Sequence, residues 1–184
     1  MSLENARSNL KEFGKELGLG DLEFDENNTC ILGIDNTFSL HITYEPHSDR
    51  LYLYSPILDG LPKDPTNRLK LYEALLEGSM LGGQMAGGGI GVAVAEELIL
   101  MHCVIEMGIG ADPSSLRCFA PVFVERVEFW RKRGHALRDG QDLPPAERGG
   151  PGRPPVPGAL PGPGGMPGSI PGQPGKPGQP FTKV

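Results

Sequence analysis

The sequence predicts an α+β fold with the element order helix, three strands, helix, two strands, helix (α-β-β-β-α-β-β-α) and one twisted antiparallel sheet. Three observations lead to this prediction. Three segments repeat apolar residues at helical spacing, five shorter segments alternate or concentrate apolar residues as strands do, and short turns typical of antiparallel hairpins join neighbouring strands.

The first helix is expected over residues 2–17. Its apolar residues recur at intervals of three and four, which places them on one stripe, with Ser2 available as N-cap and Gly18 or Gly20 as the stop. The stripe consists of Leu3, Ala6, Leu10, Phe13 and Leu17.

Three strands follow as a meander. Residues 29–34 are strand-like, Asp35-Asn36 suits a two-residue hairpin turn, and residues 38–44 alternate apolar and polar side chains. In the third strand, residues 50–56, leucines occupy one face and Tyr52 and Tyr54 the other. Two interpretations of the tyrosine face stay open: it covers the sheet, or it is a contact surface for another molecule.

The second helix is predicted from Pro65 to about Leu81, because Asp64 is an N-cap residue and proline suits the first helical position. Its apolar arc is wider than one contact with a sheet needs, so either the first helix or a second subunit covers the remainder. The arc consists of Leu69, Leu71, Tyr72, Leu75, Leu76 and Met80.

The glycine-rich segment LGGQMAGGGIGVA, residues 81–93, invites a phosphate-binding interpretation that its spacing does not support. It lacks the lysine and hydroxyl of a P-loop, it follows a helix instead of a strand, and no helix begins after it. Glu77 also stands where a Gly-x-Ser-x-Gly nucleophile elbow around Ser79 needs glycine. We therefore interpret the segment as a joint that turns the second helix into the fourth strand.

The fourth and fifth strands form a predicted hairpin around a turn at Ala95-Glu96-Glu97, and the fifth is apolar on both faces, as expected inside a sheet. His102 lies in that strand without the ligand spacing of a metal site. The last helix is expected to open at Asp112-Pro113 and to end at Gly134. Its inner stripe consists of Leu116, Phe119, Phe123, Val127 and Trp130.

Composition divides the chain into a folded domain, residues 1–138, and a disordered Pro/Gly-rich tail, residues 139–184. Thirteen of the 19 prolines lie between Pro144 and Pro180, where almost no branched or aromatic residue could form a core. The tail carries a net charge of +1, so the chain's −6 leaves −7 on the domain. This acidity argues against nucleic acid and anionic membranes as partners.

The sequence indicates a cytoplasmic protein without a metal or cofactor. Its N-terminal residues are polar, and no apolar stretch is long enough to be a signal peptide core or a membrane span. The three cysteines, Cys30, Cys103 and Cys118, show no C-x-x-C spacing and are expected to be reduced thiols packed in the core.

The segments FSLHITYEPHSDRLYLYSPILDGLP and LYEALLEGSMLGGQMAGGGIGVA, in this order of elements, resemble class I type III secretion chaperones of the Tir-chaperone (CesT) family. The likeness is nearest to the multiple-effector chaperones of chlamydial type and covers residues 2–130. It implies a non-enzymatic bacterial protein that binds the extended N-terminal region of secreted effectors and keeps them soluble and secretion-competent. Further implied partners are a second copy of the chain, a secretion ATPase or a second chaperone.

Carried onto matching positions, the resemblance implies two sets of contact residues. The homodimer interface would include Leu69, Tyr72, Leu75, Leu76, Met80 and Gly88. The cargo-binding surface would include Phe13, Leu17, Leu51, Leu53 and Tyr54.

Two rival functions remain. One is an adaptor whose Pro-rich tail is the active part, since such segments dock in aromatic grooves of other proteins. The other is a small-molecule or nucleotide-binding enzyme that uses the glycine-rich segment, which the missing motif residues make the weaker alternative.

Overall fold

The computed structural model describes residues 2–141 and 181–183. The chain divides into two compact units, one of residues 1–143 with 180–184 and one of residues 144–179. The second unit lies outside the described residues. The elements are α1 (Ser2–Leu17), β1 (Thr29–Ile34), β2 (Phe38–Glu45), β3 (Arg50–Asp59), α2 (Pro65–Ser79), the short 3-10 helix η1 (Met80–Gly82), β4 (Gly89–Ala93), β5 (Leu98–Glu106), α3 (Ser115–Arg138) and β6 (Phe181–Lys183).

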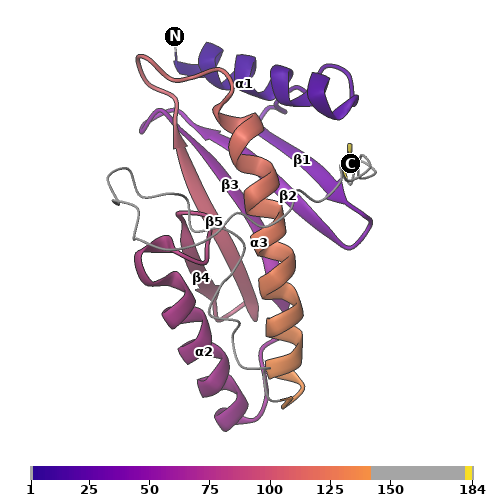
Figure 1. Ribbon diagram of the computed structural model, residues 1–184, viewed down its shortest axis with the longest axis vertical. Helices are drawn as coiled ribbons and strands as arrows, with labels where there is room; N and C mark the ends of the chain where they lie inside the picture. The colour runs from indigo at the N-terminus through magenta and orange to yellow at the C-terminus, as the bar shows by residue number, and fades with distance from the viewer. Residues whose placement is uncertain (1, 142–180, 184) are drawn as a thin grey trace, which may run out of the picture. The chain divides into compact units, whose positions relative to one another are not determined.

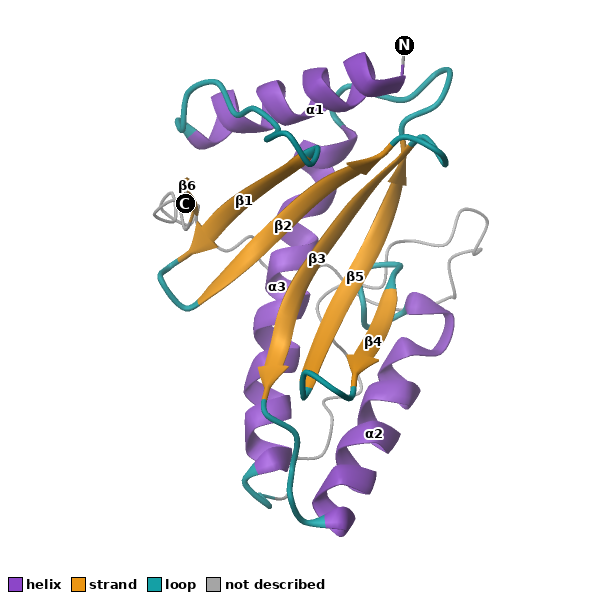
Figure 2. Ribbon diagram, turned by 180° about the vertical axis from the view of Figure 1, so that it is seen from behind, coloured by secondary structure: helices purple, strands orange, loops and turns teal. Residues whose placement is uncertain are grey.

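The strands form one antiparallel sheet in the order β4-β5-β3-β2-β1-β6. Its β1–β5 part is shown from the side that no helix covers in Figure 2, where α3 runs behind the sheet. Alternate side chains of each strand form the core with α3, among them Leu32, Ile42, Leu53 and Met101, each exposing none of its surface. The α+β prediction and its order of elements are therefore confirmed.

The helix α1 crosses the N-terminal end of α3 (Figure 1), and a buried amide fastens the two. Asn9 donates from Nδ2 to the carbonyl of Asp112 at 3.1 Å and accepts at Oδ1 from the backbone N–H of Leu116 at 3.0 Å. It thus satisfies a first-turn N–H of α3 that has no partner within the helix. The helix α3 begins at Ser115, later than the predicted opening at Asp112-Pro113, because Asp112 instead caps a turn by accepting from Ser114.

The first hairpin turns at the predicted residues, although three residues instead of two separate Ile34 from its pairing partner Phe38. Asp35 and Asn36 both have positive φ, 45° and 54°, and Thr37 N–H donates to the carbonyl of Ile34 at 2.8 Å. Positive φ at both central residues is the type I′ geometry that suits the twist of the flanking strands. The expected faces of β2 follow, with Leu40, Ile42 and Tyr44 buried.

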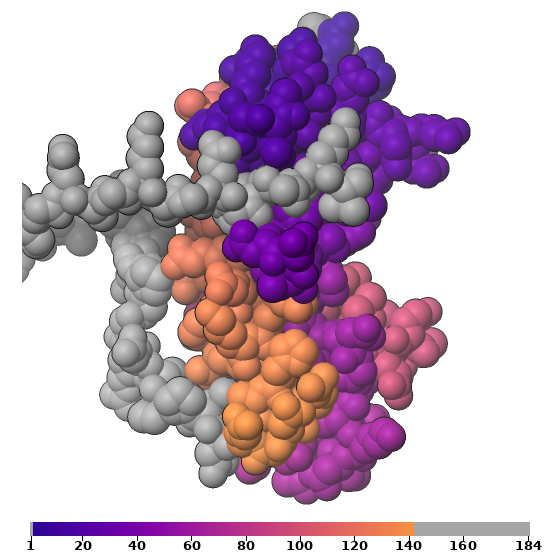
Figure 3. Space-filling view, turned by 90° about the vertical axis from the view of Figure 1, so that its right-hand side faces the viewer, coloured from indigo at the N-terminus to yellow at the C-terminus, as the bar shows by residue number. Residues whose placement is uncertain are grey.

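The helix α2 starts as predicted, because Asp64 accepts from the N–H of Asn67 at 2.8 Å and proline occupies the first turn. Its C-terminal half lies beside α3, where Trp130 covers Gly78 so closely that a side chain at Gly78 would overlap the indole ring. The space-filling view of Figure 3 shows the orange surface of α3 next to the magenta surface of α2. Trp130 also donates from Nε1 to the carbonyl of Gln84 at 3.0 Å.

Further predictions about α3 are wrong. The helix does not end at Gly134 but continues to Arg138, with Gly134 buried inside it. Cys118 and Phe119 were expected in the core, but Cys118 is exposed and Phe119 exposes 42% of its surface. Both lie on the solvent side of the helix, because Leu116 and Ala120 are the residues of that turn that face α1 and the sheet. Cys30 and Cys103 are buried as expected, and burial raises the pKa of the Cys103 thiol to about 12.

The strand β6 was not expected. It pairs antiparallel with β1 and belongs to the part of the chain that the sequence assigns to the tail. Most of residues 139–184 lies outside the described residues, so the division into a domain and a disordered tail stays a prediction.

Candidate functional site

The helix α2 carries apolar residues on two faces. The inner face is closed: Leu71 exposes none of its surface and Leu75 only 2%, while Gly78 meets Trp130. The outer face is open, since Leu69, Leu76 and Met80 expose 57%, 72% and 68%. Leu69 and Leu76 lie on one stripe because they are seven positions apart, and Met80 follows directly after the last residue of α2. Such a stripe on a helix that already has a packed face indicates a binding surface.

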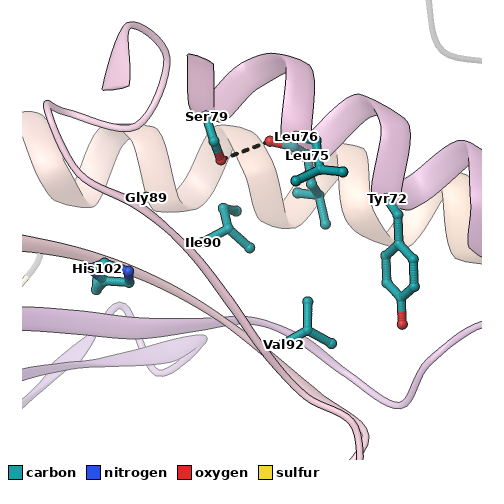
Figure 4. A pocket seen from close by; sticks show the side chains of 8 residues that line it. All are labelled: Tyr72, Leu75, Leu76, Ser79, Gly89, Ile90, Val92 and His102. Carbon is teal, nitrogen blue, oxygen red and sulfur yellow. Dashed lines mark hydrogen bonds between the residues drawn. The ribbon is translucent and has the colours of Figure 1, made fainter. Parts of the chain in front are cut away.

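Between α2 and β4 lies a groove of about 380 Å³, which we call the α2–β4 groove. Figure 4 shows Leu75, Leu76 and Tyr72 of the helix above Ile90 and Val92 of the strand. Its full lining is Tyr72, Leu75, Leu76, Ser79, Gly89, Ile90, Val92 and His102. The exposed side chains of Val92 and Val94 continue the apolar surface along the strand. Because β4 is an edge strand, the surface combines a helix stripe with a strand edge.

The groove has little chemistry beyond apolar contact. Ser79 donates from its hydroxyl to the carbonyl of Leu75 at 2.8 Å, a common use of serine in a helix. Among residues 2–141 and 181–183 no three His, Cys, Asp or Glu side chains lie close enough to hold a metal ion. No helix within these ranges is long and apolar enough to cross a membrane.

The glycine-rich segment uses its own backbone amides. The N–H groups of Gln84, Met85, Gly87 and Gly88 donate to carbonyls between Gly78 and Met85 at 2.8–3.3 Å. These N–H groups are therefore already hydrogen-bonded within the segment and do not point outward together, as the N–H groups of a phosphate-binding loop do. Gly88 is needed within the chain, because a side chain there would collide with the main-chain carbonyl of His102 on β5.

The second surface is the helix-free side of the sheet, which we call the outer sheet face. Cross-strand neighbours place His41, Tyr54 and His102 in one row across β2, β3 and β5. The His41 and Tyr54 rings stack with centroids 4.8 Å apart, and burial lowers the pKa of His41. The next row pairs Tyr52 with Val104, which exposes 38%. The face is thus aromatic and aliphatic with few charges, as the alternation of leucine and tyrosine in β3 indicates.

The structure brings most of the predicted dimer residues together. Tyr72, Leu75 and Leu76 line the α2–β4 groove, and Leu69 and Met80 extend it along the helix. Leu75 offers little surface to the groove, because the residue exposes only 2% of its surface. Gly88 serves the junction with β5, as described above. Their role in an interface stays a prediction.

The predicted cargo residues are divided. Leu51 and Leu53 expose nothing, Phe13 exposes 2% and Leu17 9%, because all four form the core between α1, α3 and the sheet. In this structure they have no surface with which to contact cargo. Tyr54 alone is part of the outer sheet face.

Some exposed apolar residues were missing from the predicted sites. Leu81 exposes 99% of its surface with a positive φ of 53°, and Val92 and Val94 expose 39% and 66%. The two valines and Ile90 alternate along the sequence, which was the available signal for a strand with one apolar face. Leu81 had no such signal, because its exposure follows from the left-handed turn after α2.

The comparisons with known proteins address the fold and the family. The model of the Tir chaperone protein (CesT) family matches residues 8–131. No curated protein sequence matches the chain at a significant level.

Three solved structures share the fold. A chain of the HopA1–SchA chaperone–effector complex is 23% identical with a TM-score of 0.55, over 71% of this chain and 97% of that one. A chain of the ExsC–ExsE complex is 16% identical with a TM-score of 0.57, over 70% and 92%. A chain from the Yersinia pestis type III secretion chaperone SycH bound to a stable fragment of YscM2 is 18% identical with a TM-score of 0.52, over 68% and 98%.

At these identities the structural likeness concerns the fold alone. The family model carries the assignment, because it covers 124 of the 184 residues, from within α1 to within α3. The chain therefore belongs to the Tir chaperone protein (CesT) family, a family of type III secretion chaperones and not of enzymes.

Proposed function

We propose that this protein is a cytoplasmic bacterial chaperone that binds the extended N-terminal segment of secreted effectors and acts as a homodimer. The observation that carries the proposal is the open apolar stripe of α2 beside an edge strand, in a chain that belongs to a chaperone family. Binding an unfolded segment needs exposed apolar surface and backbone edges, and no reacting group.

The α2–β4 groove is the proposed dimer surface. A twofold axis through α2 would bury Leu69, Leu76 and Met80 of both copies against each other, since a C2 interface joins the same patch twice. The three large apolar side chains exposed on α2 and at its end would otherwise remain in water, at a cost of about 25 cal/mol per Å² of apolar surface.

The dimer is tested with Leu76→Asp. A buried, unpaired carboxylate is strongly unfavourable, so the variant should sediment as a monomer at micromolar concentration while retaining its far-UV circular dichroism. The matched control is Lys70→Asp, which places the same side chain on an exposed polar position of the same helix and should remain dimeric. A monomeric wild-type protein would contradict the homodimer.

The outer sheet face is the proposed cargo surface, in place of the buried leucines that the family resemblance suggested. Tyr52, Tyr54 and Val104 supply rings and a methyl-bearing side chain on neighbouring strands. Aromatic rings of this kind offer large contact area at low cost in side-chain entropy. The Thr29 and Thr43 hydroxyls, 2.8 Å apart, add hydrogen-bonding groups at the β1 side of the same face.

A pull-down from the native cytosol followed by mass spectrometry tests the cargo class. We expect secreted effectors captured through their N-terminal regions, and loss of most of the capture with the double substitution Tyr52→Ala and Tyr54→Ala. Thr66→Ala, on an exposed position of α2, is the control. If capture requires residues 139–184 and is unchanged by the two tyrosine substitutions, the result would instead favour an adaptor with a Pro-rich docking tail.

A further inference from the structure

The strand β6 occupies one edge of the sheet. Phe181, Thr182 and Lys183 pair with Ile34, Gly33 and Leu32 in antiparallel register. On its other side β1 pairs with β2 along all six residues from Thr29 to Ile34. Half of the outer edge of β1 is therefore covered by a segment of the same chain that is nearly 150 residues away in sequence.

An uncovered edge strand presents a row of unpaired N–H and C=O groups that any extended segment can use. Of the two edges of this sheet, β4 lies in the α2–β4 groove that we assign to the dimer. The edge of β1 is then the position left for a strand supplied by a partner, which would add to the sheet through main-chain hydrogen bonds.

We infer that β6 is an internal occupant of the β1 edge and competes with a strand supplied in trans for Leu32, Gly33 and Ile34. This inference rests on the proposed function, since the natural competitor is the extended segment of an effector. In the absence of cargo β6 shields the edge from unspecific strand pairing, and cargo binding releases it.

The dimensions of β6 suit a replaceable occupant. It has three residues, whereas β1 has six, so an incoming strand that pairs with the whole of β1 forms a ladder about twice as long. Covalent attachment compensates for the short ladder, because pairing within one chain does not lose the translational freedom that a separate peptide loses. Residues 142–180 join α3 to β6, and 39 residues can span more than 100 Å at roughly 3.3 Å each, so reach is no restriction.

The first test uses a peptide and needs no effector. A fluorescein-labelled peptide with the sequence of residues 178–184, GQPFTKV, is titrated against the full chain and against a Phe181→Pro/Thr182→Pro variant, since one of two adjacent residues must direct its N–H toward β1. Proline lacks the N–H that a strand ladder requires, so the variant should leave the edge open. Because apparent affinity scales with the open fraction, we expect the peptide to bind the variant about tenfold more tightly.

The matched control carries Ser169→Pro and Ile170→Pro, which add the same two prolines outside β6. It should bind the peptide as the wild type does. Hydrogen exchange gives a second measurement. Those amides of residues 32–34 that point toward β6 should exchange faster in the β6 variant, and they should be unchanged in the control. Equal peptide affinity for all three proteins, or unchanged exchange in β1, would overturn the inference.

The second test uses the N-terminal segment of an effector captured by the wild-type chain. The β6 variant should bind it several times more tightly than the wild type and the control do. The β6 variant could bind the peptide more tightly than the wild type does and yet bind the effector segment equally tightly. That result would show that cargo does not use this edge, and it would overturn the release of β6 by cargo. Failure of every protein to bind effectors would instead contradict the proposed function, while the peptide result would still decide whether β6 occupies β1.

Discussion

The two apolar faces of α2 contain similar side chains in opposite surroundings. Leu71 and Leu75 are closed in against α3, whereas Leu69, Leu76 and Met80 project into solvent. On the inner face Gly78 lies where α2 comes close to Trp130, and a larger side chain there would overlap the indole ring. The exposed leucines of the outer face are not fitted to another part of the chain in this way. The inner face is thus shaped to a partner within the fold, and the outer face is available to a second molecule.

This contrast separates residues that stabilise the chain from residues that assemble it. A substitution on the inner face should change the free energy of unfolding of every copy. A substitution on the outer face should change association and leave the fold of the single chain intact.

The largest effect is expected for Leu71→Ala on the inner face. Removal of a fully buried leucine leaves a cavity between α2 and α3 and should lower the free energy of unfolding by about 2–5 kcal/mol. Urea denaturation monitored by Trp130 fluorescence measures it. A loss below 1 kcal/mol would mean that α2 is held chiefly by its outer face.

Gly88→Val tests whether the glycine-rich segment belongs to the fold or to the interface. The new side chain would meet the main-chain carbonyl of His102, so β4 would have to move away from β5, at a cost of about 1–3 kcal/mol. Thermal unfolding should shift at every protein concentration. Gly83→Val is the control, because its nearest neighbour would lie 3.7 Å away. A shift that disappears on dilution would assign Gly88 to the dimer instead.

Leu76→Ala on the outer face should change the stability of the single chain by less than about 0.5 kcal/mol, since the side chain is already 72% exposed. Any larger loss should depend on protein concentration, because it would arise from a weakened dimer. A large loss that is independent of concentration would show that Leu76 packs within its own chain, and the contrast between the two faces would fail.

The smallest effect concerns the outer sheet face and pH. Burial lowers the pKa of His41 below its ordinary 6.5, so the unfolded chain takes up a proton before the folded chain does. The contribution of His41 to the free energy of unfolding is therefore present above pH 6.5 and is lost as pH decreases below it. His41→Gln should flatten this slope in unfolding experiments between pH 7.5 and pH 5, at constant salt. The exposed His47→Gln is the control, and an equal slope in both variants would contradict the assignment.

Local signals predicted most of the fold. The Asp64-Pro65 start of α2, the Asp35-Asn36 turn and the alternation in β2 depend on residues close in sequence, and each has the expected geometry. The start of α3 was misplaced because Asp112 caps a separate turn, while Asn9, more than a hundred residues away, accepts from the first-turn N–H of Leu116, which no local pattern shows.

Periodicity defines the faces of a helix or strand without saying which face is covered. The wide arc of α2, the leucines and tyrosines of β3 and the position of Cys118 were visible in the sequence, but their burial depended on where α3 and α1 come to lie. The pairing of β6 with β1 is the extreme case, since a hydrogen-bonded edge forms between segments nearly 150 residues apart. Sequence order and side-chain spacing thus establish the elements, and the resemblance of two segments indicates the family. Packing over long sequence distances determines which apolar surfaces remain for partners.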